Sequence, residues 1–322
     1  ALLVIVVTLV ASWLLLSQLR FPSVAGDAAA AAIYLSNVRF AANAIDYLGS
    51  EVAPSPLLHF WSLGVEEQFY FFWPLIIAVS LRLMRPARLA LVVGPMVVVS
   101  FWLALIWTDI AAPWAFFSLP TRAWQLGVGA LIAIGLLRLP ERAPDWLYSG
   151  SSWLGLAIIA FGVVAIGADT PYPGTAALIP IVGTALVIIG GARSRTAPSR
   201  LLSTSGPRFI GRISYSLYLW HWPILVLVPI ALGVESLALN LGLVVVAGLL
   251  AWLSTDLAES PIRHGQLLPM RPRASVVSAV TASVVVAVGA VGLGMLTTGP
   301  TTTPSIAAVE RSTELPDPVR SG

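Results

Sequence analysis

The segment from His59 to Pro74 carries the residues best suited to chemistry. Its sequence is HFWSLGVEEQFYFFWP, in which two adjacent carboxylates, Glu66 and Glu67, stand among aromatic residues. On a helix His59, Glu66 and Tyr70 share one face, whereas Glu67 lies about 100° round the axis. Carboxylates in an apolar environment suit general acid/base work or the orientation of a histidine. The alternative is that one glutamate pairs with a distant arginine and only supports helix packing.

A second polar segment, PTRAWQLGVGA, begins at Pro120. On a helix Arg122, Gln125 and Gly129 line one face, Trp124 lies nearby in the sequence, and the small residues permit close approach of another helix. Arg122 could neutralise a carboxylate, and we expect one of the two glutamates as its partner, or it could hold a polar substrate. It could also extend from the apolar layer to the membrane surface.

A third segment, ISYSLYLWHWP at 213–223, combines hydroxyl, imidazole and indole groups. Ser214, Tyr218 and His221 form a stripe at helical spacing, with Trp222 beside it. A histidine enclosed by aromatic side chains can carry protons, help to stack a substrate, or serve as a hydrogen-bonded structural residue. The spacing leaves all three roles open.

The segment DLAESPIR at 256–263 combines two carboxylates with Arg263. It is typical of a helix end that carries an ion pair. The alternative is that Arg263 contributes to a site for an anionic cytosolic donor.

Other kinds of site are not indicated. The three histidines, His59, His221 and His264, have no metal-ligand spacing, and the chain has no cysteine. Phosphate-binding glycine loops and the GxSxG nucleophile motif are absent from the sequence. We therefore expect neither a metal nor a bound cofactor.

The composition identifies the elements that must position these groups. Of the 322 residues, 57% are hydrophobic and only 10% are charged, and the mean hydropathy is +0.88. A soluble domain carries about 25% charged residues, so a soluble enzyme is excluded. A disordered chain needs high charge and low hydrophobicity, and a disulfide scaffold needs cysteines, so both of these classes are excluded as well. The net charge of +3 comes with arginines that form no dense run, so we expect no nucleic-acid partner. The chain is expected to be a multi-pass membrane protein.

Nine stretches are long and apolar enough to predict membrane spans, which need about 20 residues each. Helices are the expected form, because lipid requires backbone groups to be satisfied within the segment. The predicted fold is therefore an all-α polytopic bundle. The 18–59 connection includes an Ala-rich part that we expect to form a helix lying on or dipping into the membrane surface. The predicted spans are 1–17, 60–82, 89–108, 118–137, 152–168, 175–192, 212–231, 237–257 and 275–296.

Arginine placement orients this bundle. The loops after every second span would be cytoplasmic, and the 18–59 connection and the C-terminal tail extracytoplasmic. The tail, 297–322, is rich in Thr and Pro and is expected to be an extended linker. The arginines on the cytoplasmic side are Arg82, Arg85, Arg88, Arg138, Arg142, Arg193, Arg195, Arg200, Arg208, Arg212, Arg263, Arg271 and Arg273.

These segments, in this order, resemble the acyltransferase-3 family of bacterial membrane O-acyltransferases. The matching stretches are SNVRFAANAIDYL (36–48), HFWSLGVEEQFYFFWP (59–74), TRAWQLGVGAL (121–131), ISYSLYLWHWP (213–223) and ESPIR (259–263). The chain is most similar to the branch in which the membrane domain precedes an outward-facing SGNH-type hydrolase domain. That arrangement implies a membrane domain over 1–296, followed by the linker.

The resemblance implies an enzyme of the bacterial inner membrane. It would pass an acyl group, typically acetyl from cytosolic acetyl-CoA, to a hydroxyl of an extracytoplasmic glycan or lipid-linked saccharide. The family's presumed catalytic histidine lies on its first span, and the present first helix matches the family's third. Because Ala1 also opens inside an apolar stretch, we expect a fragment that lacks two spans and is inactive alone.

The resemblance also implies roles for the polar residues. Glu66 or Glu67 would orient the missing histidine or accept a proton from the acceptor hydroxyl, and Arg122 would stabilise an oxyanion or anionic glycan groups. Gln125 departs from the glutamate common in the family, which puts a second carboxylate there in doubt. The remaining expected site residues line the acceptor cavity or, for Arg263, face the acyl-CoA phosphates: His59, Tyr70, Trp124, Gln125, Ser214, Tyr218, His221, Trp222 and Arg263.

Three other functions remain open. Buried Glu, Arg and His are also typical of proton-coupled transporters, although the two halves show no inverted repeat. The chain could be a catalytically inactive relative. It could also be a membrane anchor for an outer domain, which would leave the buried carboxylates unexplained.

Overall fold

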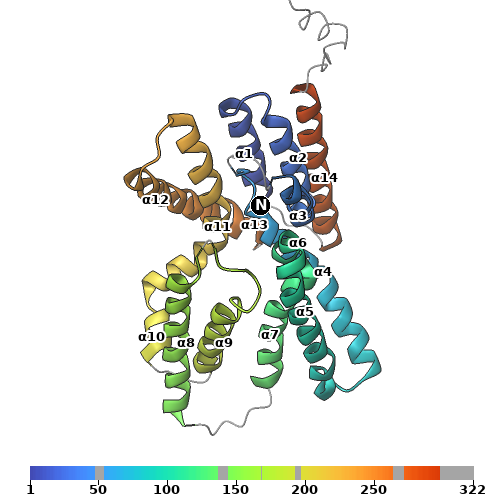
Figure 1. The fold of residues 1–322 in the computed structure, drawn as a ribbon, viewed down its shortest axis with the longest axis vertical. Coiled ribbons are helices and arrows are strands. Elements are labelled where there is room, and N and C mark those ends of the chain that lie inside the picture. Colours follow the sequence, from blue (N-terminus) through green and yellow to red (C-terminus); the bar gives the residue numbers. More distant parts are fainter. Residues whose placement is uncertain (48–53, 137–143, 168, 193–196, 264–271, 298–322) are drawn as a thin grey trace, which may run out of the picture.

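The structure, a computed structural model, describes residues 1–47, 54–136, 144–167, 169–192, 197–263 and 272–297 (Figure 1). Of these residues 86% are helical, and no strand occurs among them. The predicted loops around residues 137–143, 193–196 and 264–271 and the predicted linker lie outside the described residues. The helices are α1 (Leu2–Leu15), α2 (Phe21–Ala32), α3 (Ser36–Tyr47), α4 (Phe60–Leu83), η1 (Pro86–Arg88), α5 (Ala90–Ile110), α6 (Ala112–Phe117), α7 (Leu119–Leu136), α8 (Asp145–Ala165), α9 (Leu178–Ala192), α10 (Ala197–Leu202), α11 (Ser205–Leu232), α12 (Leu237–Ser254), the π-helical turn η2 (Thr255–Glu259), α13 (Ser260–Arg263) and α14 (Pro272–Thr297).

Every predicted span corresponds to a helix, so the all-α polytopic fold is confirmed. Among the described residues, five helical stretches are long and apolar enough to cross a membrane, whereas α1 and α9 are apolar but shorter. The helices α4 and α7 have 24 and 18 residues but are not among the five. Their interiors hold polar side chains such as Glu66, Glu67 and Arg122, which lower the hydropathy. The five stretches are Ala90–Ile110, Asp145–Ala165, Ser205–Leu232, Leu237–Arg263 and Arg273–Thr297.

The helices pack in several groups of neighbours. In Figure 1, α1, α2 and α14 stand together in the upper part, α4, α5 and α7 lie at lower right, and α8 and α9 lie at lower left. The helices α11 and α12 form a pair at upper left. The main apolar core joins α1, α2, the start of α4, α11, α12 and α14, with Phe21 and Phe60 as its largest fully buried side chains.

The Ala-rich part of the 18–59 connection differs from the single helix that we predicted. It forms two helices, α2 and α3, because the chain reverses at Tyr34, which adopts a left-handed φ of 58°. The alanines of α2 are buried in the main core against α1 and α14. Small side chains therefore serve close helix packing here.

The α8–α9 contact depends on glycines. A Cβ at Gly190 would lie 2.2 Å from Ser152 Oγ, and a Cβ at Gly155 would lie 2.5 Å from the Gly183 carbonyl oxygen. Small residues at a helix interface let two backbones approach closely.

Candidate active site

The N-terminal end of α4 meets the middle of α11 in a cluster of polar side chains. We call this set, His59, Ser62, Tyr218, His221 and Trp222, the histidine cluster. The ring of His59 lies 5.5 Å from the Tyr218 ring and 5.8 Å from the His221 ring, measured between centroids. About 160 positions separate the residues at the start of α4 from those on α11, and only the tertiary fold brings the two groups together.

His59 is held on two sides. Its Nε2 lies 3.2 Å from the Leu219 carbonyl oxygen, and its own carbonyl accepts a 2.6 Å hydrogen bond from the Tyr218 hydroxyl. The Ser62 hydroxyl also hydrogen-bonds the Tyr218 hydroxyl. His59 is 5% exposed, so burial and these hydrogen bonds together fix its orientation.

His221 and Trp222 complete the cluster. His221 Nδ1 donates to the Tyr218 carbonyl at 2.7 Å, and the Trp222 indole donates to the Ser55 carbonyl at 2.9 Å. The predicted stripe on α11 therefore holds for Tyr218 and His221. Ser214 differs, because it is exposed and its hydroxyl donates back to the Gly211 carbonyl.

Arg122, at the start of α7, lies in a cage of aromatic rings. Its Cζ is 5.2 Å from the Trp61 ring centroid, 4.8 Å from that of Phe116 and 4.9 Å from that of Tyr172. Its Nε donates to the Phe116 carbonyl at 2.9 Å. The side chain is almost fully buried, and Nη2 has no hydrogen-bond partner among the described residues. The cage therefore holds a cation that has one unused hydrogen-bond donor. Such a group suits an anion or a developing negative charge.

The expected ion pair between Arg122 and Glu66 or Glu67 does not occur. The described ion pairs join other residues, and Arg122 interacts instead with carbonyl and aromatic groups. Glu66 accepts a 2.5 Å hydrogen bond from Tyr70 one turn along α4, so these two are neighbours as predicted. Tyr70 itself is 53% exposed.

The two glutamates lie within electrostatic range of tyrosines on α11 and at the α2–α3 turn. Both interact electrostatically with Tyr215, and Glu66 also with Tyr218, on the next turns of α11. Burial, and then the nearby Glu67 carboxylate, raise the pKa of Tyr34 above its ordinary value. Glu66 is thus within electrostatic range of Tyr218, a member of the histidine cluster.

An amide clasp that the sequence did not reveal joins α3 to α4 and α6. Gln68 donates to Asn37 Oδ1 at 2.9 Å and to the Tyr34 carbonyl at 3.0 Å, while Asn37 donates to the Phe117 carbonyl at 3.2 Å. Both residues lie in motifs that we identified, but we assigned the function of the second motif to the carboxylates next to Gln68 and not to Gln68 itself. The clasp positions the glutamates on α4 relative to the aromatic residues of α6.

Two other expected site residues, Trp124 and Gln125, lie on α7. Trp124 is buried against Phe101, with ring centroids 4.8 Å apart, in a small core between α5, α7 and α9. Gln125 is half-buried, and its amide nitrogen has no partner among the described residues. The buried indole nitrogen of Trp124 also has no partner among the described residues, and its contact with substrate stays a prediction.

Arg263 donates to Glu259 at 2.8 Å, and Arg212 pairs with Asp256 at 3.2 Å. The predicted ion pair at this helix end is therefore present. The Ser216 hydroxyl also donates to Glu259, which ties this end to α11. Among the described residues no three His, Asp or Glu side chains are placed to hold a metal ion.

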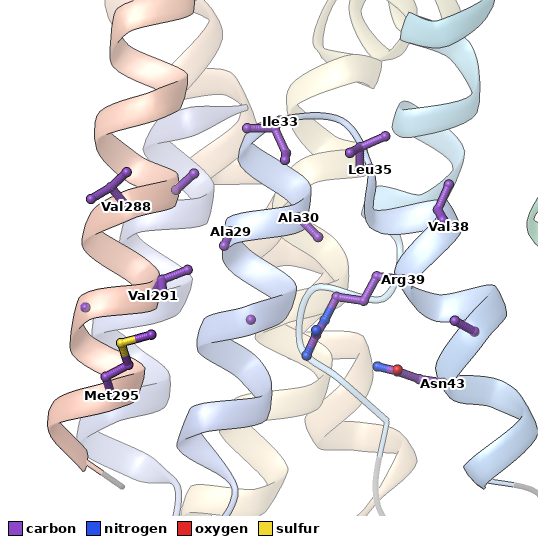
Figure 2. A pocket seen from close by; sticks show the side chains of 14 residues that line it. Ala29, Ala30, Ile33, Leu35, Val38, Arg39, Asn43, Val288, Val291 and Met295 are labelled. Atoms are coloured by element: carbon purple, nitrogen blue, oxygen red, sulfur yellow. The ribbon is translucent and has the colours of Figure 1, made fainter.

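A groove of about 790 Å³ opens between α2, α3 and α14, away from the histidine cluster. Figure 2 shows Arg39 and Asn43 among its otherwise apolar walls. Arg39 Nε donates to the buried Asp27 carboxylate at 2.6 Å. The ion pair joins α2 to α3, a role that the sequence did not indicate.

Comparison with known proteins gives a consistent assignment. A family model described as "Acyltransferase domain" matches residues 1–257. The chain is 30% identical over 257 residues to YrhL of Bacillus subtilis (strain 168), covering 75% of this chain and 40% of YrhL. It is 30% identical over 250 residues to the peptidoglycan O-acetyltransferase OatA of Listeria monocytogenes, covering 74% of this chain and 40% of OatA. It is also 28% identical over 248 residues to the O-acetyltransferase OatA of Staphylococcus aureus (strain NCTC 8325 / PS 47), covering 74% and 41%.

The chain thus spans about 40% of the length of these relatives. No solved structure matches it. The family match ends at residue 257, so α14 and the predicted domain boundary at 296 lie beyond it.

Proposed function

The chain belongs to the acyltransferase-domain family, and from this premise we propose that it is the membrane part of an O-acetyltransferase. It transfers an acyl group, typically acetyl, from cytosolic acyl-CoA to a hydroxyl of an extracytoplasmic glycan at the bacterial inner membrane. Peptidoglycan is the first acceptor to test, because a relative that matches most of this chain is named a peptidoglycan O-acetyltransferase. We also propose that the full-length protein carries two further spans before the present first helix and an outer SGNH-type domain.

The geometric observation that carries the proposal is the buried cation of Arg122. Acyl transfer passes through a tetrahedral intermediate whose oxygen is negatively charged, and hydrogen-bond donors fixed in a dry site stabilise that charge. Arg122 has such a donor at Nη2, and its aromatic cage excludes water. An anionic group on the glycan would satisfy the same donor.

The glutamates and Arg263 take complementary roles. Glu66 or Glu67 accepts a proton or orients a histidine, and Glu66 is within electrostatic range of Tyr218 in the histidine cluster. Arg263 has an exposed side chain although it pairs with Glu259, so it can still meet the phosphates of acyl-CoA. Tyr218, His221 and Trp222 line the acceptor side.

The test uses the native full-length protein in membrane vesicles with acetyl-labelled acetyl-CoA on the cytosolic face. Label on the glycan as a base-labile ester supports the proposal, whereas uptake of a free solute without ester formation favours a transporter. Absence of transfer by the wild-type protein contradicts the proposed function.

Changing Glu66 and Glu67 to glutamine tests the site within that assay. We expect transfer to be abolished with expression retained when both are changed, because an amide can neither accept a proton nor orient a histidine as a carboxylate does. Single variants then show which of the two carboxylates matters. Wild-type turnover in the double variant would refute the role of the glutamates and leave the proposed reaction standing.

A further inference from the structure

The hydrogen bonds of His59 determine where its ring protons lie. The Leu219 carbonyl oxygen can only accept, so Nε2 of His59 carries the proton that lies between them. In the neutral ring Nδ1 is then an acceptor with a free lone pair. The tautomer of His59 is thus fixed by α11.

The lone pair on Nδ1 is buried and unmatched. His59 is 5% exposed, and Nδ1 has no hydrogen-bond partner within the part of the chain that the structure describes. Buried polar atoms in folded proteins nearly always have a partner, and an unmet one lowers stability. An orphaned nitrogen inside a polar cluster therefore points to a donor that the described protein groups do not supply.

The neighbouring groups use their protons elsewhere. The Tyr218 hydroxyl donates its single proton to the His59 carbonyl, and His221 Nδ1 donates to the Tyr218 carbonyl. The Ser62 hydroxyl has the Tyr218 oxygen and the His59 carbonyl as its partners. The donor to His59 Nδ1 thus comes from outside this set.

We infer that His59 Nδ1 binds the hydroxyl group that becomes acylated and acts as its proton acceptor. This inference rests on the proposed function. The hydroxyl proton passes to Nδ1 as the hydroxyl oxygen bonds to the carbonyl carbon of an acyl ester or thioester. The bond from that carbon to the donor's oxygen or sulfur then breaks, and the imidazolium returns the proton to that atom.

Two amide substitutions separate this role from a structural one. Glutamine places its amide near the position of Nε2, so His59→Gln keeps the bond to Leu219 and loses the acceptor at Nδ1. Asparagine places its amide near Nδ1, so His59→Asn keeps an acceptor there and loses the bond to Leu219. Both are compared in the full-length protein by thermal unfolding and by kcat and KM for the glycan acceptor.

We expect His59→Gln to unfold like the wild type, with transfer lowered by about 10²- to 10⁴-fold, the usual range for loss of a general base. We expect His59→Asn to unfold at lower temperature, with a KM near that of the wild type and a low kcat. A purely structural His59 gives the opposite order, in which Gln is active and Asn loses activity only in proportion to unfolded protein.

Wild-type kcat in a folded His59→Gln variant overturns the inference. If His59→Gln does not fold, His59→Asn decides, and wild-type kcat per folded molecule overturns the inference equally. Wild-type protein that transfers no label contradicts the proposed function itself, whereas an active wild type with an active His59→Gln variant contradicts only the assignment of His59.

Discussion

At the scale of single residues, Arg122 departs most from expectation. A buried cation is costly unless a carboxylate or several acceptors compensate it. Here the compensation comes from three aromatic rings, one carbonyl and a side-chain hydrogen bond with Tyr172, and no described carboxylate pairs with it. Such a residue reduces stability, so its presence is better explained by function than by packing.

Replacing Arg122 by methionine should therefore separate stability from activity. We expect the unfolding temperature to stay the same or rise, because a buried charge is replaced by an apolar side chain of similar length. Glycan acetylation should fall to background. Thermal unfolding in detergent and the vesicle assay measure the two effects.

Arg122→Lys is the matched control for charge. Lysine keeps the positive charge but lacks the planar group that stacks on aromatic rings, so partial activity at most is expected. A methionine variant that transfers acetyl groups at the wild-type rate would exclude an electrostatic role for Arg122.

At the scale of elements, glycine positions decide how closely α8 and α9 pack. Gly190 faces Ser152 and the Tyr148 carbonyl of α8, at distances that leave no room for a Cβ. Its neighbour Gly191 faces open space. Helix propensity is identical at the two positions, so only the contact differs.

Gly190→Ala and Gly191→Ala form a matched pair. We expect Gly190→Ala to destabilise the protein by about 1–3 kcal/mol, since overpacking forces the helices apart. Gly191→Ala should be neutral or slightly stabilising, because alanine favours the helix. Equal unfolding free energies for the two variants would show that the α8–α9 contact is looser than described.

At the scale of the whole molecule, the arginine pattern predicts an orientation in the membrane. The α4–α5 turn is predicted to be cytoplasmic and the α11–α12 turn extracytoplasmic. In Figure 1 these turns lie at lower right and upper left, toward opposite ends of the long axis.

Single cysteines can test this orientation, because the chain has none of its own. We expect a membrane-impermeant maleimide to label Glu235→Cys, in the α11–α12 turn, in intact spheroplasts. Met84→Cys, directly after α4, should be labelled only after the membrane is opened. The reverse pattern would contradict the predicted topology. It would also contradict the proposed access of an extracytoplasmic acceptor to the glutamates.

Composition and periodicity alone determined the class of this protein. Helices formed wherever apolar runs were long enough, because backbone groups in lipid must be satisfied within one segment. The polar motifs were equally visible, since intramembrane Glu, Arg and His are rare. Neighbours on one helix, such as Glu66 and Tyr70 or Tyr218 and His221, followed from helical spacing.

Only the tertiary structure decided which residues meet across helices. It placed His59 against Leu219 and Tyr218, surrounded Arg122 with aromatic rings rather than a glutamate, and joined Asn37 to Gln68. It also packed Trp124 against Phe101 and divided the Ala-rich connection into two helices, α2 and α3. Helical periodicity defines a face but not its neighbour, because that choice depends on how all the helices fill the available volume.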